Sequence, residues 1–93
     1  MVWKMCLSLN LIYFVADKNN HCIRKVDLLN AYVTTYAGLC GEEGFLDGPF
    51  EINRLSYPDN IGVDLDGNIF VYDSGNKFVR MIDPLGNIDN IFI

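Results

Sequence analysis

The chain has one histidine, His21, and few positive charges: 7 Lys and Arg stand against 12 Asp and Glu, for a formal net charge of −5. A single histidine leaves a zinc site short of ligands, and the spacing indicates no Ser-His-Asp or Cys-His arrangement. Binding to phosphate backbones or anionic membranes depends on cationic patches, so the charge argues against both as main partners. We predict no catalytic residue, metal site or cofactor, and we expect His21 to lie in a turn.

Cysteine is scarce and odd in number, and no pair among Cys6, Cys22 and Cys40 has C-x-x-C spacing. A disulfide framework uses an even number of cysteines, so we expect three thiols, which favours a reducing compartment. The apolar N-terminal stretch is interrupted by Asn10, lacks a small-residue cleavage site and is too short to span a membrane. It predicts a strand rather than a signal peptide, and the sequence gives no other indication of location.

The sequence contains an internal repeat. FVADKNNHCIRKVD at 14–27 returns as FVYDSGNKFVRMID at 70–83, an offset of 56 positions from 14 to 70. Internal repeats of this size indicate solenoids, propellers or arrays. The identical pairs are Phe14 and Phe70, Val15 and Val71, Asp17 and Asp73, Asn20 and Asn76, Arg24 and Arg80, and Asp27 and Asp83.

Short β-rich segments fill both copies. With 51% hydrophobic and 13% aromatic residues the chain is not expected to be disordered. Val, Ile, Tyr, Phe and Thr favour strands, and the short polar links with Asn, Gly and Pro are typical of hairpin turns. The expected fold is all-β, with four-stranded antiparallel meanders: a first blade at 1–37, an inter-blade loop at 38–59 and a second blade at 60–93. The expected strands cover 4–9, 11–17, 22–27, 32–37, 60–65, 68–73, 78–83 and 87–93.

The repeated polar residues could mark a catalytic set or an architectural one. A single active site needs each group once, whereas these residues recur at equivalent places in both copies. Asp and Asn cap hairpin turns through side-chain bonds, and Arg pairs with an acid on a neighbouring strand. The architectural interpretation is therefore favoured for the repeat signature, which comprises Asp17, Asn20, His21, Arg24, Asp27, Asp73, Asn76, Arg80 and Asp83.

Residues 62–73 can be aligned with a calcium-binding loop, with Asp64, Asp66, Gly67 and Asp73 at suitable places. An EF-hand loop also needs a carboxylate or Asn at its first position, where this sequence has Gly62, and it needs flanking helices. A β-turn is favoured over a calcium site.

The inter-blade loop is glycine-rich and acidic. Long ordered loops in compact β domains often carry function, and an acidic loop favours a basic protein or peptide as partner. The candidate partner-binding residues are Glu42, Glu43, Asp47, Arg54 and Tyr57.

Four-stranded meanders in tandem are typical of β-propeller blades. Residues 14–27 resemble the signature of the NHL repeat, although Cys22 stands where Leu is usual. Residues 32–73 resemble a variant of that family with V-T-T, A-G, G-F-x-D-G and G-V-x-D motifs. The resemblance implies a propeller of about six blades, with the G-V-x-D strand lining the central channel and the T-T strand outermost. Two blades cannot close such a ring, so we expect a fragment of a larger propeller or a subunit that associates to cover its blade faces.

Three functions follow as hypotheses. The first is a non-catalytic scaffold that binds a protein or peptide through its loops. The alternative is a set of blades from a propeller enzyme, lyase- or hydrolase-like, whose catalytic residues lie outside this chain. RNA binding, known among NHL proteins, requires a basic face that this sequence does not supply.

Overall fold

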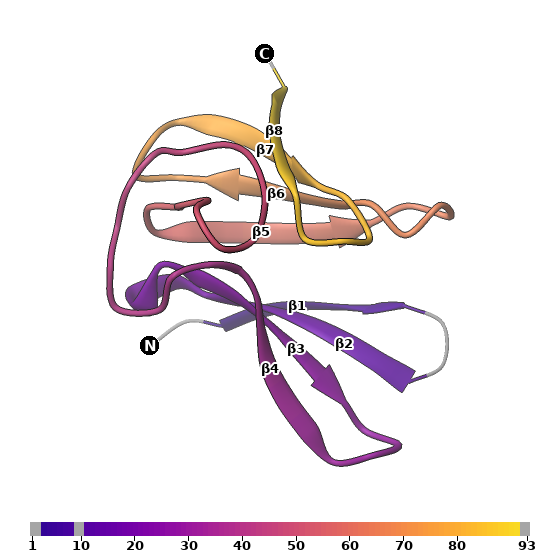
Figure 1. Ribbon diagram of the computed structural model, residues 1–93. Coiled ribbons are helices and arrows are strands. Elements are labelled where there is room, and N and C mark those ends of the chain that lie inside the picture. Colours follow the sequence, from indigo (N-terminus) through magenta and orange to yellow (C-terminus); the bar gives the residue numbers. More distant parts are fainter. Residues whose placement is uncertain (1–2, 9–10, 92–93) are drawn as a thin grey trace.

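The computed structural model describes the backbone of residues 3–8 and 11–91 and the side chains of residues 11–89. Within these ranges the chain forms two four-stranded antiparallel sheets, each in simple meander order (Figure 1). This confirms the prediction of two all-β blades. The first blade comprises β1 (Trp3–Ser8), β2 (Ile12–Asp17), β3 (Cys22–Asp27) and β4 (Tyr32–Gly38), and the second comprises β5 (Pro58–Val63), β6 (Ile69–Asp73), β7 (Phe78–Ile82) and β8 (Ile88–Ile91).

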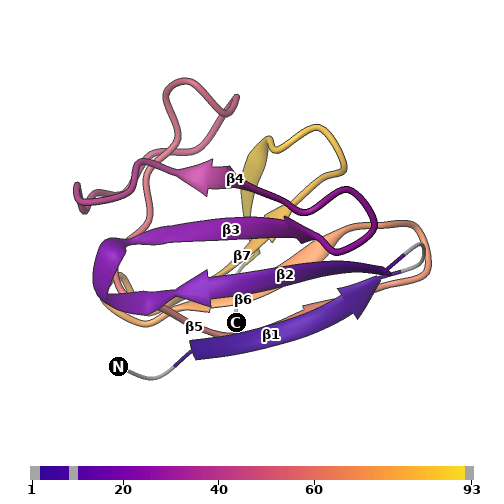
Figure 2. The same cartoon turned by 90° about the horizontal axis from the view of Figure 1, so that it is seen from below.

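The two sheets pack face to face, and the core lies between them (Figures 1 and 2). Alternation along each strand decides which side chains enter this core. On β2 it selects Phe14 and Ala16, and on β6 it selects Ile69 and Val71. Leu55, from the inter-blade loop, is fully buried in the same cluster. Strands β1 and β2 of the first blade lie beside β5 of the second.

Polar residues stabilise the tight turns, as the sequence indicates. Asp64 Oδ1 accepts hydrogen bonds from the backbone N–H groups of Asp66 and Asn68, at 2.9 and 2.8 Å. These donors, the one from Asn68 above all, lower the pKa of the Asp64 carboxyl. The carboxylate of Asp73, at the end of β6, is bonded to other groups, which are described below. No cluster of metal-binding side chains occurs among residues 11–89.

The turn between β2 and β3 is a short 3-10 segment, Lys18–Asn20, which ends at His21 in the left-handed conformation (φ 61°). Lys77 has the same φ at the equivalent turn of the second blade. His21 therefore lies in a turn as expected, but its side chain is only 7% exposed. Its Nδ1 accepts the backbone N–H of Tyr57 at 3.1 Å, which ties the first blade to the end of the inter-blade loop.

Candidate binding surface

The inter-blade loop is held by its own backbone hydrogen bonds. Leu46 and Arg54 pair in antiparallel fashion, and Gly48 pairs with Ile88 at the start of β8 through two bonds of 2.9 Å. A loop of this length that makes ladder contacts with the adjacent blade has little freedom to rearrange. It is therefore an ordered part of the fold, visible beside both sheets in Figure 1.

Asn53 is the buried anchor of this loop. The side chain is 0% exposed, and its Oδ1 accepts the N–H of Gly38, the last residue of β4, at 2.7 Å. Its Nδ2 donates to the carbonyl of Gly48 in the loop and to that of Gly86 in the turn between β7 and β8, at 3.0 and 2.8 Å. One amide thus connects the first blade, the loop and the second blade.

Arg80 is the second anchor and is also fully buried. Its Nη1 donates to Asp73 Oδ2 at 2.6 Å, and its Nη2 donates to Asp47 Oδ1 at 2.8 Å. The carbonyls of Leu46 and Arg54 accept further bonds from the guanidinium, at 3.1 and 3.3 Å. Burial raises the pKa of the Asp73 carboxyl, against the opposing effect of its bonds from Asn76, Ser56 and Arg80.

The aromatic ring of Phe45 lies on the Arg80 guanidinium, with 4.7 Å from the ring centroid to Cζ. Phe45 also stacks on Phe78 of β7 at a centroid distance of 5.1 Å. The loop is therefore fixed over the end of the second blade by charge, hydrogen bonds and aromatic packing together.

The five candidate residues of the loop have different environments. Glu42 and Glu43 are exposed, with Glu43 accepting a long hydrogen bond of 3.4 Å from the Ser56 hydroxyl. Asp47 is half-exposed but is bound to Arg80, so part of its role is structural. The Arg54 guanidinium donates to the neighbouring Asn53 carbonyl at 2.8 Å. Tyr57 is 41% exposed, and its ring lies roughly perpendicular to that of His21, with the ring centroids 4.4 Å apart.

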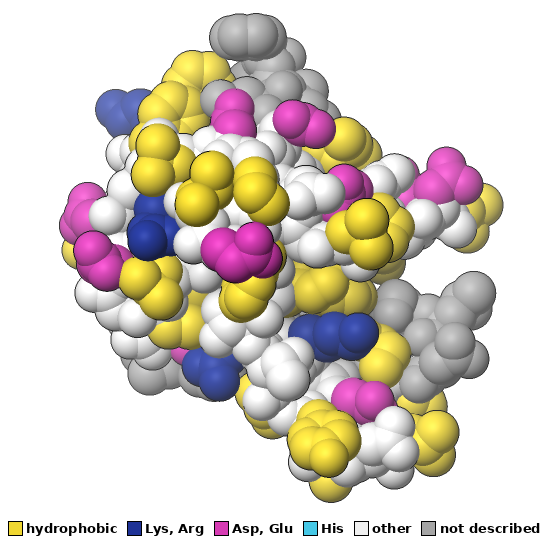
Figure 3. All heavy atoms as spheres, viewed as in Figure 1, with side chains coloured by type: hydrophobic (Ala, Val, Ile, Leu, Met, Phe, Trp, Pro, Cys, Tyr) yellow, Lys and Arg dark blue, Asp and Glu magenta, His cyan; other side chains and the backbone are white. Residues whose placement is uncertain are grey.

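Between residues 45 and 52 of the loop, four large apolar side chains remain exposed although the backbone is fixed: Phe45 (44%), Leu46 (53%), Phe50 (39%) and Ile52 (52%). We call these residues the apolar quartet. Glu51 lies next to Ile52 and is also exposed, and Figure 3 shows hydrophobic and acidic side chains intermixed on the side of the molecule that carries the loop. The sequence prediction emphasised acidity and did not identify the quartet, because apolar loop residues are normally expected to turn inward.

The repeat signature occupies equivalent places in the two blades. Asn20 donates to Asp17 at 3.1 Å, and Asn76 donates to Asp73 at 2.7 Å. Asp27 and Asp83 accept backbone N–H groups of the following turns, those of Asn30 and Asn87, at 3.1 and 3.0 Å. The donor from Asn87 lowers the pKa of Asp83. These contacts are of the turn-capping kind.

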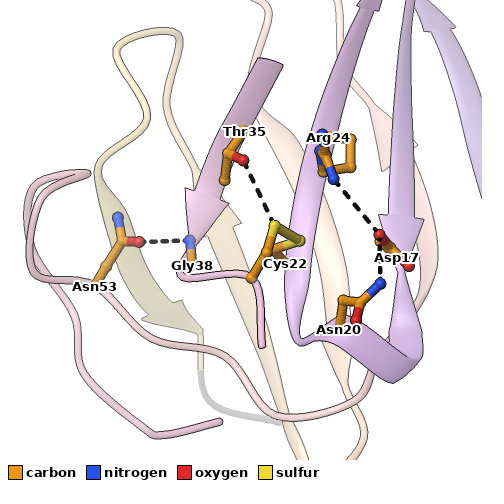
Figure 4. The surroundings of a disulfide bond; sticks show 8 residues. Asp17, Asn20, Cys22, Arg24, Thr35, Gly38 and Asn53 are labelled. Carbon is orange, nitrogen blue, oxygen red and sulfur yellow. Dashed lines mark hydrogen bonds and ion pairs between the residues drawn. A yellow bond between two sulfur atoms is a disulfide. The ribbon is translucent and has the colours of Figure 1, made fainter. Parts of the chain in front are cut away.

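The cysteine prediction was wrong for two residues. Cys22 and Cys40 form a disulfide, with their Cα atoms 5.0 Å apart (Figure 4). Cys22 pairs with Gly38 across β3 and β4, and Gly38 has a φ of +78°, which turns the chain back so that Cys40 reaches its partner. The cysteines therefore no longer favour a reducing compartment. The side chain of Cys6 lies outside the described residues.

We expect reduction of this disulfide to lower the free energy of unfolding by about 2–3 kcal/mol, because it closes a loop with a sequence separation of 18. Urea denaturation followed by circular dichroism, with and without dithiothreitol, measures the difference. The Cys40→Ser variant should be insensitive to the reductant. Superimposable curves for the parent chain under both conditions would contradict a stabilising role.

In the part of the chain that the structure describes, no helix is long and apolar enough to cross a membrane.

No protein-family model matches the chain. It is 37% identical over 79 residues to Protein SUPPRESSOR OF QUENCHING 1, chloroplastic, of Arabidopsis thaliana, a match that covers 85% of the chain and 7% of that protein. Two solved structures, auxiliary nutrient binding proteins from Bacteroides thetaiotaomicron and Bacteroides ovatus, superpose with TM-scores of 0.76 and 0.79 at 16% identity. Each superposition covers 95% of the chain and 24% of the larger structure. The fold is thus that of two β-propeller blades, and the chain spans a small part of each of these proteins.

Proposed function

We propose that this chain forms two blades of an NHL-type propeller that binds a protein or peptide through the outer surface of the inter-blade loop, without chemistry of its own. The NHL assignment is supported by the signature at 14–27 and by the motifs that precede the second blade. The names of the two solved neighbours, both binding proteins, are in keeping with a binding role.

The observation that carries the proposal is the apolar quartet on a fixed loop. Asn53 and Arg80 hold the loop backbone, so the four side chains cannot fold inward without breaking buried hydrogen bonds. Exposed apolar groups that are rimmed by polar residues mark interaction sites, and a pre-ordered surface loses little conformational entropy on binding.

The charge around the quartet defines the partner's chemistry. Glu42, Glu43 and Glu51 are exposed and lie in the same loop. Acidic groups on the same loop attract Lys and Arg and accelerate association, while the apolar quartet supplies most of the affinity. A basic segment that presents Leu or aromatic side chains fits both requirements.

The test uses defined peptides as probes: one alternating Lys and Leu, and a control alternating Glu and Leu, titrated into the labelled chain and followed by NMR chemical shifts. The Lys-Leu peptide should perturb the signals of the loop. The double substitution Glu42→Ser, Glu43→Ser should weaken binding about 3- to 10-fold and reduce its salt dependence. Asp47 is left intact because it is bound to Arg80.

The matched control is Asp66→Ser with Asp89→Ser, which removes the same charge from exposed positions outside the loop. This variant should bind like the parent. Equal losses in both variants would show a diffuse charge effect and contradict a loop site, as would shifts that spread evenly over both blades. The substitution Phe50→Ser tests the apolar centre and should weaken binding at high salt as well.

A further inference from the structure

The same spacing relates two sets of polar residues, Asp17, Asn20 and Arg24 in the first blade and Asp73, Asn76 and Arg80 in the second. Among the described residues, only the side chains of the second set are also hydrogen-bonded to the inter-blade loop. In the second blade Asp73 Oδ1 accepts the backbone N–H of Ser56 at 2.7 Å. Asn76 also donates to the carbonyl of Gly44 at 2.9 Å. Together with the bonds from Arg80, these contacts fix residues 44–56 of the loop onto the turn between β6 and β7.

Within residues 11–89, the first set makes its internal contacts and no others of this kind. Asp17 is 2% exposed, yet its Oδ1 has no hydrogen-bond partner among the described residues. Arg24 pairs with Asp17 at 3.8 Å and leaves its buried Nε without a partner there (Figure 4). The Nε of Arg80 has no hydrogen-bond partner among the described residues either, so this atom does not distinguish the two sets. They differ in that Asp17 Oδ1 lacks a donor, and in that the Nη groups of Arg80, unlike those of Arg24, donate to carbonyls of the loop. An unpaired buried carboxylate oxygen is costly, which points to an absent donor.

The orientation of this set agrees with a docking role. Phe14, Ala16 and Ile23 enter the core against the second blade. Asp17 and Arg24 alternate with them along β2 and β3, so they belong to the opposite face of the sheet. In the second blade, the face that carries Asp73 and Arg80 is the one that receives the loop.

We infer that Asp17, Asn20 and Arg24 form a docking site for the acidic loop of a further propeller blade. That loop presents a backbone N–H to Asp17 Oδ1, and carbonyls and one carboxylate to Arg24, as residues 44–56 do for the second blade. The 93 residues hold one such loop, and it is already bound to Arg80. A second copy of the chain has its own loop engaged in the same way, so the occupant comes from a different blade.

The first experiment titrates a synthetic peptide of residues 43–57 into the intact chain and follows the arginine Nε–Hε signals by NMR. The Arg24 signal should shift and saturate, while the Arg80 signal, whose site is filled, stays in place. An Asp47→Asn peptide should bind about tenfold more weakly. Asp17→Asn should remove the Arg24 shift, whereas Lys25→Gln, on the same strand, should not. In Arg24→Gln, which lacks this signal, the backbone amide signals of residues 17–24 should no longer respond to the peptide as they do in the parent.

A second experiment avoids the weak affinity of a free peptide. By the repeat offset Pro58 corresponds to Val2, so a copy of residues 38–57 is joined directly before Val2 of the full chain. This extension should raise Tm by roughly 5 °C relative to an extension of scrambled sequence. The rise should vanish when Arg24→Gln is introduced.

Three results would overturn the inference. The scrambled extension could stabilise the chain equally, or the peptide could shift the signals of the Arg24→Gln variant as strongly as those of the parent. The Arg24 signal could also shift when the concentration of the chain alone is raised, which would identify a second copy as the occupant.

Discussion

Replacing Arg80 with methionine is expected to lower the free energy of unfolding by roughly 3–5 kcal/mol. The substitution keeps much of the side-chain volume but leaves the Asp73 carboxylate, itself 0% exposed, without its cation. It also leaves the carbonyls of Leu46 and Arg54 without their donor and frees Asp47. Arg80→Lys should recover only part of the loss, because an ammonium cannot reproduce the planar fork that reaches four acceptors. Urea denaturation monitored by circular dichroism measures these values.

The matched control is Arg24→Met in the first blade. Arg24 is 29% exposed and its ion pair with Asp17 is 3.8 Å long, so a loss of about 0–1 kcal/mol is expected. Adding Asp73→Asn to Arg80→Met should restore some stability, since the buried charge is then removed while Oδ1 can still accept the N–H of Ser56. Equal losses for the two arginine variants would show that identical spacing, rather than burial and loop contacts, determines their contribution.

The second large effect is expected for Asn53→Ala, at roughly 3–5 kcal/mol. The change removes three hydrogen bonds and leaves the N–H of Gly38 and the carbonyls of Gly48 and Gly86 unpaired. Water cannot replace the side chain freely, because this position is fully buried. Asn53→Asp should not rescue stability at neutral pH, since it keeps the acceptor and turns two donors into lone pairs that face carbonyl oxygens.

Thermal and urea denaturation of Asn53→Ala are compared with those of Asn19→Ala, which alters an exposed turn asparagine. The control should lie within about 0.5 kcal/mol of the parent. A loss for Asn53→Ala of that same small size would refute its role as the anchor of the loop. Retention of both sheets with increased hydrogen exchange confined to residues 39–57 would show that the blades fold independently of the loop.

The strands and their order could be predicted because local signals agree there. Runs of β-branched and aromatic residues within 11–17 and 68–73 indicate strands, and Asp, Asn and Gly at the links define turns. The repeat then placed the less regular stretch at 4–9 as a strand, and β1 covers Trp3–Ser8. None of these inferences needed information about contacts between distant residues.

The loop could not be predicted in the same way. Asn53 resembles any polar loop residue, since its three partners lie 15, 5 and 33 positions away and belong to different elements. Cys22 and Cys40 meet only because β3 pairs with β4 and the chain reverses after Gly38. Arg24 and Arg80 occupy the same position of the repeated motif. Only Arg80 is covered by the loop, and its side chain is 0% exposed whereas that of Arg24 is 29% exposed.

The hydrogen bonds that join the two blades also restrict the rotation of one sheet relative to the other. Asn53 links β4 to the turn after β7, and the Tyr36 hydroxyl donates to the Asp83 carbonyl at 2.8 Å, close to that same turn. Together with the core packed between the sheets, they help to determine the angle through which one sheet is turned relative to the next. A propeller closes only when these successive angles add up to a full circle. The contacts of one buried amide and one tyrosine hydroxyl thus help to set how many blades a ring built from this unit contains.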